Sequence, residues 1–148
     1  MPKNLLILGC SATKNHQTGP MPAARRYRGA YYQILHNVPG NKWPEIVILS
    51  AKLGFIRGED LIEDYDLLLD KARSQELCED ETQRSTLLSL LSSEYENVFV
   101  AAGSLYRSVI TRHLPQNLSA LARHATGGIG MQRKQLKIWL ASIQKTTG

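Results

Sequence analysis

The sequence predicts an α/β protein with three layers, in which helices cover both faces of a mainly parallel sheet of four or five strands. Three apolar runs of strand length, at residues 5–8, 45–50 and 97–102, are each followed by small residues and, further along, by a helical pattern. This alternation indicates buried parallel strands joined by helices. With 148 residues, 43% of them hydrophobic, the chain can bury one core. We therefore expect a single α/β domain over residues 1–148.

The first strand, at 5–8, runs into the segment Gly-Cys-Ser-Ala-Thr-Lys at 9–14. Small hydroxyl residues and a lysine directly after a strand are typical of a loop whose N–H groups approach an anion. The segment lacks the second glycine of a phosphate loop, so a nucleoside triphosphate is not implied. A Gly- and Pro-containing loop follows at 15–22, and residues 23–37 then have the pattern of a helix, with Arg and Tyr interleaved near its start.

The second strand, at 45–50, is the centre of the predicted organisation. It ends in Ser-Ala-Lys, which places Ser50 and Lys52 at a strand end, where open α/β sheets carry their chemistry. Gly54 then breaks the pattern, and an acidic loop with Glu59, Asp60, Asp64 and Asp66 follows. A plain solvated loop would show the same charges, so that interpretation stays open.

The remaining elements continue the alternation of strands and helices. Residues 74–93 have the longest helical pattern, and the third strand follows at 97–102. Gly103 and Ser104 open a helix that ends before Pro115, and residues 118–123 fit either a short strand or a turn of helix. A Gly-rich segment at 126–130 leads into a last helix at 131–143. Such a segment can bind an anion, but it also fits a tight turn.

The charges are strongly segregated along the chain. Residues 1–44 hold six Lys and Arg and residues 97–148 hold seven, and neither segment contains Asp or Glu. All 13 acidic residues lie between Glu45 and Glu96. If both ends fold onto one face, that face suits a polyanion. We therefore expect DNA as a partner, with phosphate contacts from Arg25, Arg26, Gly128, Gly130, Arg133 and Lys134. A basic surface that only keeps the protein in solution is the alternative.

Several classes of protein are not indicated. No apolar run approaches the ~20 residues that cross a membrane, and the first residues do not resemble a signal peptide, so we expect a cytoplasmic protein. The two cysteines, Cys10 and Cys78, do not have the spacing of metal ligands. We expect no metal and no other cofactor.

Motifs spread from Leu5 to Leu140 resemble a family of small bacterial and phage domains. They are the Cys-Ser-x-x-Lys start at 10–14, Ser-Ala-Lys-Leu-Gly at 50–54, Tyr-Asp at 65–66, Ala-Gly-x-x-Tyr at 102–106 and Gly-x-Gly at 128–130. The central block is also similar to the peroxide-stress protein YaaA, although Leu53 stands where YaaA has Tyr and Asp64 where Pro is common. The wider group is related to the uracil-DNA glycosylase superfamily, so the resemblance implies a uracil-DNA-glycosylase-like fold.

The resemblance also implies an activity, because some members of the group are anti-phage DNA glycosylases that excise glucosylated hydroxymethylcytosine. It implies base flipping and excision of a modified base from DNA, which leaves an abasic site. Asp60 and Asp66 are then the candidate catalytic carboxylates. Candidate substrate-binding residues are Cys10, Ser11, Lys14, Ser50, Lys52, Gly54, Tyr65 and Tyr106.

Several alternatives remain open for the function and for these residues. The protein could be a non-catalytic DNA-binding module of the YaaA kind, or an N-glycosidase or deoxyribosyl transferase that acts on free nucleotides. Asp60 also fits a capping residue of a turn, and Asp66 fits an ion pair with Lys52 or Arg57. Cys10 also fits a small packed residue, because no base is near it in the sequence.

Overall fold

A computed structural model describes residues 3–92 and 94–145. Within these residues a five-stranded sheet has the order β4-β3-β1-β6-β7. Four strands are parallel: β1 (Asn4–Gly9), β3 (Glu45–Ser50), β6 (Asn97–Ala101) and β7 (Ala122–His124). The edge strand β4 (Gly54–Arg57) is antiparallel to β3. The predicted α/β class with a mainly parallel sheet is thus confirmed, and the three predicted strands are adjacent.

β1 lies at the centre of the sheet, with β3 on one side and β6 on the other. Its four apolar side chains, Leu5 to Leu8, are completely buried, as a strand covered on both faces requires. The register pairs Gly9 with Leu49 and Leu8 with Ala101, so the carboxyl ends of all three strands meet at one edge of the sheet.

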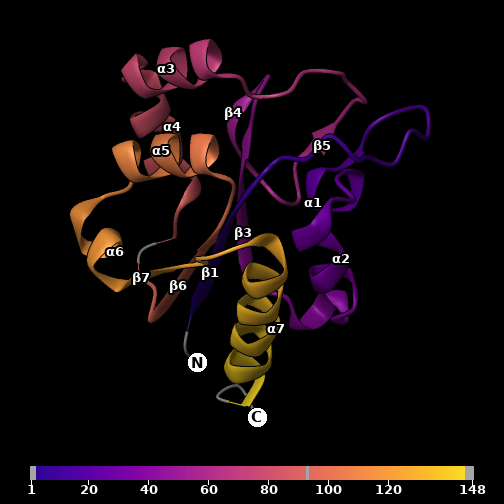
Figure 1. Cartoon of the computed structure of the whole chain (residues 1–148), viewed down its shortest axis with the longest axis vertical. Helices are drawn as coiled ribbons and strands as arrows, with labels where there is room; N and C mark the ends of the chain where they lie inside the picture. The colour runs from indigo at the N-terminus through magenta and orange to yellow at the C-terminus, as the bar shows by residue number, and fades with distance from the viewer. Residues whose placement is uncertain (1–2, 93, 146–148) are drawn as a thin grey trace.

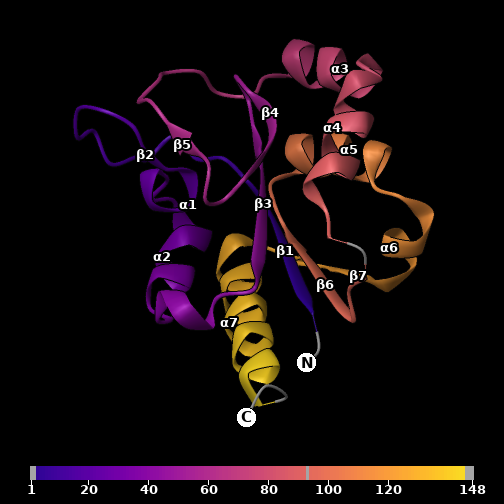
Figure 2. The ribbon, with the colours of Figure 1, turned by 180° about the vertical axis from the view of Figure 1, so that it is seen from behind.

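Helices form a layer on each face of the sheet (Figures 1 and 2). One layer contains α1 (Ala23–Arg26), α2 (Ala30–His36) and α7 (Ile129–Lys145). The other contains α3 (Lys71–Glu79), α4 (Thr82–Leu90), α5 (Ser104–His113) and α6 (Gln116–Leu121). No helix of the described ranges is long and apolar enough to cross a membrane.

The helix predicted at 23–37 is interrupted between Tyr27 and Gly29. Tyr27 has extended backbone angles and forms an isolated antiparallel bridge with Lys14, and the Tyr27 side chain is completely buried. The short strands β2 (Met21–Pro22) and β5 (Leu61–Ile62) pair nearby. A 3-10 turn, η1 (Gly40–Lys42), precedes β3. Long-range pairing has overridden the local helical pattern here.

The helix predicted at 74–93 consists of two helices, α3 and α4. Asp70 caps α3 by accepting the Arg73 N–H at 2.7 Å, so the helix begins earlier than predicted. Asp80 accepts hydrogen bonds from the Thr82 N–H and hydroxyl, which ends one helix and begins the next. The last residue of the predicted helix, Ser93, lies outside the described residues.

Three smaller predictions have mixed outcomes. Residues 118–123 contain both the end of α6 and the start of β7, so each alternative holds for part of the segment. The last helix was predicted at 131–143 and is present as α7. β4 was not predicted, because its residues were assigned to the acidic loop.

Candidate functional site

The chain leaves the carboxyl ends of β1 and β6 in opposite directions, which makes this edge of the sheet a topological switch point. β1 leads through α1 and α2 on one face to β3, whereas β6 leads through α5 and α6 on the other face to β7. Ligands of open α/β sheets bind at this kind of switch point. Gly9 and Cys10 lie at the end of β1, and Gly103 lies between the end of β6 and the start of α5.

Cys10 joins the ends of the three central strands. Its N–H donates to the Leu49 carbonyl at 2.9 Å, and its Sγ lies 3.3 Å from the Ala51 N and 3.2 Å from the Tyr106 Oη. Tyr106 approaches so closely that a Cβ at Gly9 would lie 2.8 Å from its Cγ. Glycine at position 9 therefore makes room for the tyrosine ring.

Three hydroxyl groups form a chain beside Cys10. The Tyr65 Oη lies 2.5 Å from the Tyr27 Oη and 2.8 Å from the Ser50 Oγ, which also accepts the N–H groups of Lys52 and Leu53. Two contacts between three hydroxyls use two of their three hydrogens. When Tyr27 and Ser50 both donate to Tyr65, the remaining hydrogen is that of Tyr65, whose side chain is the only one of the three that is not completely buried.

The tyrosines of the cluster are neutral at physiological pH. Burial raises the pKa of Tyr27 to about 12 and also raises the pKa of Tyr65 and Tyr106. Tyr32, which is completely buried and donates to the Gly9 carbonyl at 2.7 Å, has a pKa well above its usual value for the same reason. The cluster can therefore donate hydrogen bonds but is not a source of tyrosinate.

Two lysines complete the cluster. The Lys14 Nζ lies 4.8 Å and the Lys52 Nζ 5.7 Å from the centroid of the Tyr65 ring. Lys52 is exposed, whereas the Lys14 side chain is almost entirely buried. The site therefore combines two cations, neutral hydroxyls and an aromatic ring.

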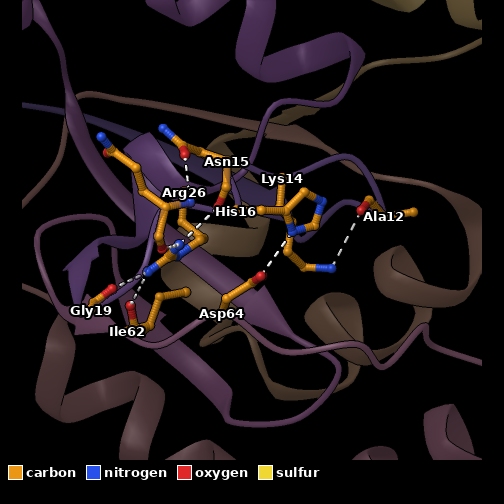
Figure 3. Close-up of polar contacts among 9 residues, drawn as sticks. Ala12, Lys14, Asn15, His16, Gly19, Arg26, Ile62 and Asp64 are labelled. Atoms are coloured by element: carbon orange, nitrogen blue, oxygen red, sulfur yellow. Dashed lines mark hydrogen bonds and ion pairs between the residues drawn. The ribbon is translucent and has the colours of Figure 1, made fainter.

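Arg26 holds the loop that carries Lys14 (Figure 3). Its guanidinium group is completely buried and donates to the carbonyls of Asn15, Gln17, Gly19 and Ile62 at 2.6–3.1 Å. A guanidinium with four bonds to carbonyls has no room for a phosphate, so the predicted phosphate contact of Arg26 is corrected. Arg26 instead organises the loop and attaches it to β5.

A second contact ties the same loop to the segment after β5. The His16 Nδ1 lies 2.8 Å from the Asp64 Oδ2 (Figure 3). This hydrogen bond lowers the pKa of the exposed Asp64 carboxyl. The segment that leads to Tyr65 is thus attached to the Lys14 loop at two points, at Ile62 through Arg26 and at Asp64 through His16.

The beginning of α7 lies next to α2. The Tyr31 hydroxyl donates to the Gln132 Oε1, and the Gln132 Nε2 donates to the Gly127 carbonyl at 2.8 Å. Burial lowers the pKa of His124, and the nearby Arg107 guanidinium lowers it further. The predicted anion segment therefore does precede a helix, and Gly128 and Gly130 are exposed there with Lys134.

Six of the eight predicted substrate-binding residues come together in this cluster: Cys10, Lys14, Ser50, Lys52, Tyr65 and Tyr106. Ser11 has a local role, since its hydroxyl donates to the Thr13 carbonyl and accepts the Gly29 N–H. Gly54 has a φ of 76°, which the turn into β4 requires. Tyr27 and Tyr32 also belong to the cluster, although neither was among the eight predicted substrate-binding residues.

The two predicted catalytic carboxylates have different environments. The Asp60 Oδ2 accepts the Arg57 N–H at 2.8 Å, and Gly58, close to Asp60 in the chain, donates its N–H to the Ile46 carbonyl. Ile46 lies four residues before Ser50, or about 13 Å along the strand. Asp60 thus caps a turn, as one of the two interpretations expected. Asp66 is exposed, and no hydrogen bond or ion pair joins it to another described residue.

A separate groove of about 700 Å³ lies toward the other end of β3. It is lined by residues that include Ile46, Arg57 and Leu91, and by Arg25, whose guanidinium lies 4.2 Å from the centroid of the Trp43 ring. The predicted phosphate-binding residue Arg25 therefore stays exposed, but it lies away from the cluster.

The fold and the site define a doubly wound α/β protein with a polar, tyrosine-rich cluster at the switch point of its sheet. The chain belongs to the family of unknown function DUF6884, whose model matches residues 5–139. It is also similar to the uncharacterized protein YfjM of Bacillus subtilis (strain 168). The two are 30% identical over 113 residues, which are 73% of this chain and 75% of YfjM. The family match covers every residue of the cluster.

Proposed function

We propose that this protein is a DNA N-glycosylase that excises a modified base, with its active site at the tyrosine–lysine cluster. One observation carries the proposal: the cluster lies beside a helical layer that contains no acidic residue. α1, α2 and α7 all come from the two acid-free parts of the chain, and they lie on the same face of the sheet. A basic layer next to a group of neutral hydrogen-bond donors suits a nucleotide flipped out of DNA.

The basic layer supplies the expected phosphate contacts. Its exposed cations are Arg25, Arg28, Lys134 and Lys137, and none of them forms an ion pair with a described acidic residue. The Tyr31–Gln132 hydrogen bond joins α2 to α7 and keeps the two helices together. The acidic residues of α3 and the loop before α4 lie in the opposite layer, so they do not weaken this field.

In the proposed reaction, water adds to the sugar C1′ while the bond between C1′ and the base nitrogen breaks. The Asp66 carboxylate, exposed beside Tyr65, accepts a proton from the attacking water. The base leaves as an anion, which the Tyr65 hydroxyl stabilises by donating a hydrogen bond, and the base then takes up a proton from water. Asp60 has no part in this scheme, because it caps a turn elsewhere. The same proposal includes the finer fold assignment to the uracil-DNA glycosylase type.

Incubation with DNAs that carry different modified bases, including glucosylated hydroxymethylcytosine, tests the proposal. We expect alkali-labile abasic sites from one of them. Asp66→Asn should lower their rate of formation by about 100-fold or more, the usual contribution of a general base. Glu63→Gln, which removes an exposed carboxylate three residues away, should leave the rate within about twofold.

Melting temperature and DNA affinity should be unchanged in Asp66→Asn, because the carboxylate has no hydrogen-bond or ion-pair partner among the described residues. DNA binding without abasic sites from any substrate would instead favour a non-catalytic module of the YaaA kind. Release of a base from mononucleotides but not from DNA would favour the nucleotide-directed N-glycosidase. Loss of activity below tenfold in Asp66→Asn, about 1.4 kcal/mol, would exclude this carboxylate from catalysis.

A further inference from the structure

Lys14 is a buried cation without a counter-ion in the described part of the chain. Its side chain is only 8% exposed, and the one hydrogen bond of its ammonium group runs to the Ala12 carbonyl at 3.4 Å (Figure 3). No ion pair joins it to an acidic residue of the described ranges. An ammonium group has three hydrogens to donate, so at least two of them have no protein acceptor.

The carboxylate of Asp64 does not neutralise Lys14. Asp64 is close enough for the Lys14 charge to lower the pKa of its carboxyl, but its Oδ2 is occupied by His16 and it lies close to the charge of Arg26 as well. A second ammonium group, that of Lys52, lies near the same Tyr65 ring and also lacks an ion pair among the described residues.

The largely buried ammonium group of Lys14 is unfavourable in an empty site, and the exposed ammonium group of Lys52 near the same ring adds repulsion between like charges. Burial of a cation away from water is costly unless an anion and hydrogen-bond acceptors compensate it. The Tyr65 ring compensates only part of the charge. The four hydrogen bonds of Arg26 nonetheless hold the loop in this arrangement, so a ligand that brings acceptors and negative charge is favoured beside Lys14.

We propose that Lys14 and Lys52 form a subsite for a phosphate group of the substrate, on the ring of Tyr65. This inference rests on the proposed function in one respect only: the phosphate is assigned to a nucleotide. A phosphate offers several acceptor oxygens and up to two negative charges, which matches two ammonium groups. The phosphate can be a diester of a DNA strand or a terminal monoester, and the charge of the monoester balances both lysines.

Calorimetric titration of the full chain tests this subsite without any measurement of base excision. The probes are a 2′-deoxynucleoside 5′-monophosphate, the same nucleoside without phosphate, and a dinucleotide that has only an internal diester. We expect the monophosphate to bind more than about tenfold tighter than the nucleoside. Lys14→Met should remove this difference in affinity. Lys42→Met removes one positive charge as well, but from an exposed side chain of η1, and should keep the difference. A dinucleotide that binds as tightly as the monophosphate would identify the diester as the natural occupant.

Thermal unfolding gives a second readout. Inorganic phosphate should raise the Tm of the parent protein by several degrees over chloride at equal ionic strength. Lys14→Met should already have a Tm about 2 °C or more above that of the parent in chloride, because a buried charge is replaced by an apolar group of similar length. It should show no additional shift in phosphate.

The subsite is overturned if nucleoside and monophosphate bind alike, or if Lys14→Met keeps both the affinity difference and the phosphate-dependent shift. These outcomes differ from failure of the proposed function. A protein that binds monophosphate through Lys14 but never forms abasic sites has the subsite without the glycosylase activity. A protein that forms abasic sites while binding no phosphate through either lysine has the activity without the subsite.

Discussion

Replacement of Arg26 by Met should destabilise the protein strongly, although Arg26 reads as one of several surface arginines in the sequence. The guanidinium group is completely buried and donates to four backbone carbonyls. Three of the carbonyls belong to the loop at 15–19, and the fourth belongs to Ile62 in β5. Methionine fills a similar volume but offers no donor, so all four carbonyls lose their partner.

The magnitude follows from the surroundings of each carbonyl. The contact with Ile62 is buried, so loss of its donor costs about 1–3 kcal/mol. The other three contacts are partly buried, and water can replace the donor at a residual cost of about 0.5–1 kcal/mol each. We expect a decrease of about 2.5–6 kcal/mol in the free energy of unfolding. This is a large part of the ~5–15 kcal/mol that stabilises a typical domain.

Urea unfolding followed by the fluorescence of Trp43 and Trp139 measures this change. Arg28→Met is the matched control, because Arg28 lies two residues away, is exposed, and has no hydrogen bond from its side chain to another described residue. It should change the free energy of unfolding by less than about 0.5 kcal/mol. A decrease below about 1 kcal/mol in Arg26→Met, or equal effects in both variants, would refute this account of the loop.

Two further predictions concern the cluster. Gly9→Ala places a Cβ 2.8 Å from the Tyr106 Cγ, so we expect the ring to be displaced and the Cys10–Tyr106 contact to be lost. The free energy of unfolding, measured with urea, should decrease by about 1–3 kcal/mol. A crystal structure of the variant in which the Tyr106 ring has not moved would contradict this prediction. The pKa of Tyr27 is raised to about 12, above its usual value near 10, so its contribution to stability is complete below pH 10. That contribution is lost as the pH rises toward 12, because the unfolded chain releases the proton first. The free energy of unfolding should therefore fall more steeply over this range in the parent protein than in Tyr27→Phe, and parallel curves would contradict the burial of this hydroxyl.

The sequence alone determined the class of the fold, and it placed most residues of the candidate site along the chain. Continuous apolar runs such as Leu5–Leu8 can be satisfied only by burial on both faces of a sheet, and that requirement is local. The ends of such strands meet at one edge, so the order of the residues was enough to assign Cys10, Ser50 and Tyr106 to one site. The charge segregation likewise indicated a basic surface, since composition does not depend on the fold.

Only the tertiary structure decided which polar residues are available to a ligand. Arg26 and Arg28 look alike in the sequence, yet one is completely buried beneath a loop and the other is exposed. Asp60 and Asp66 look alike as well, yet one caps a turn and the other stands free beside Tyr65. Tyr27 follows a helical pattern in the sequence, but its backbone pairs with Lys14 and its side chain points into the cluster. Long-range pairing and burial decide each of these differences, and neither leaves a periodic signal in the neighbouring residues.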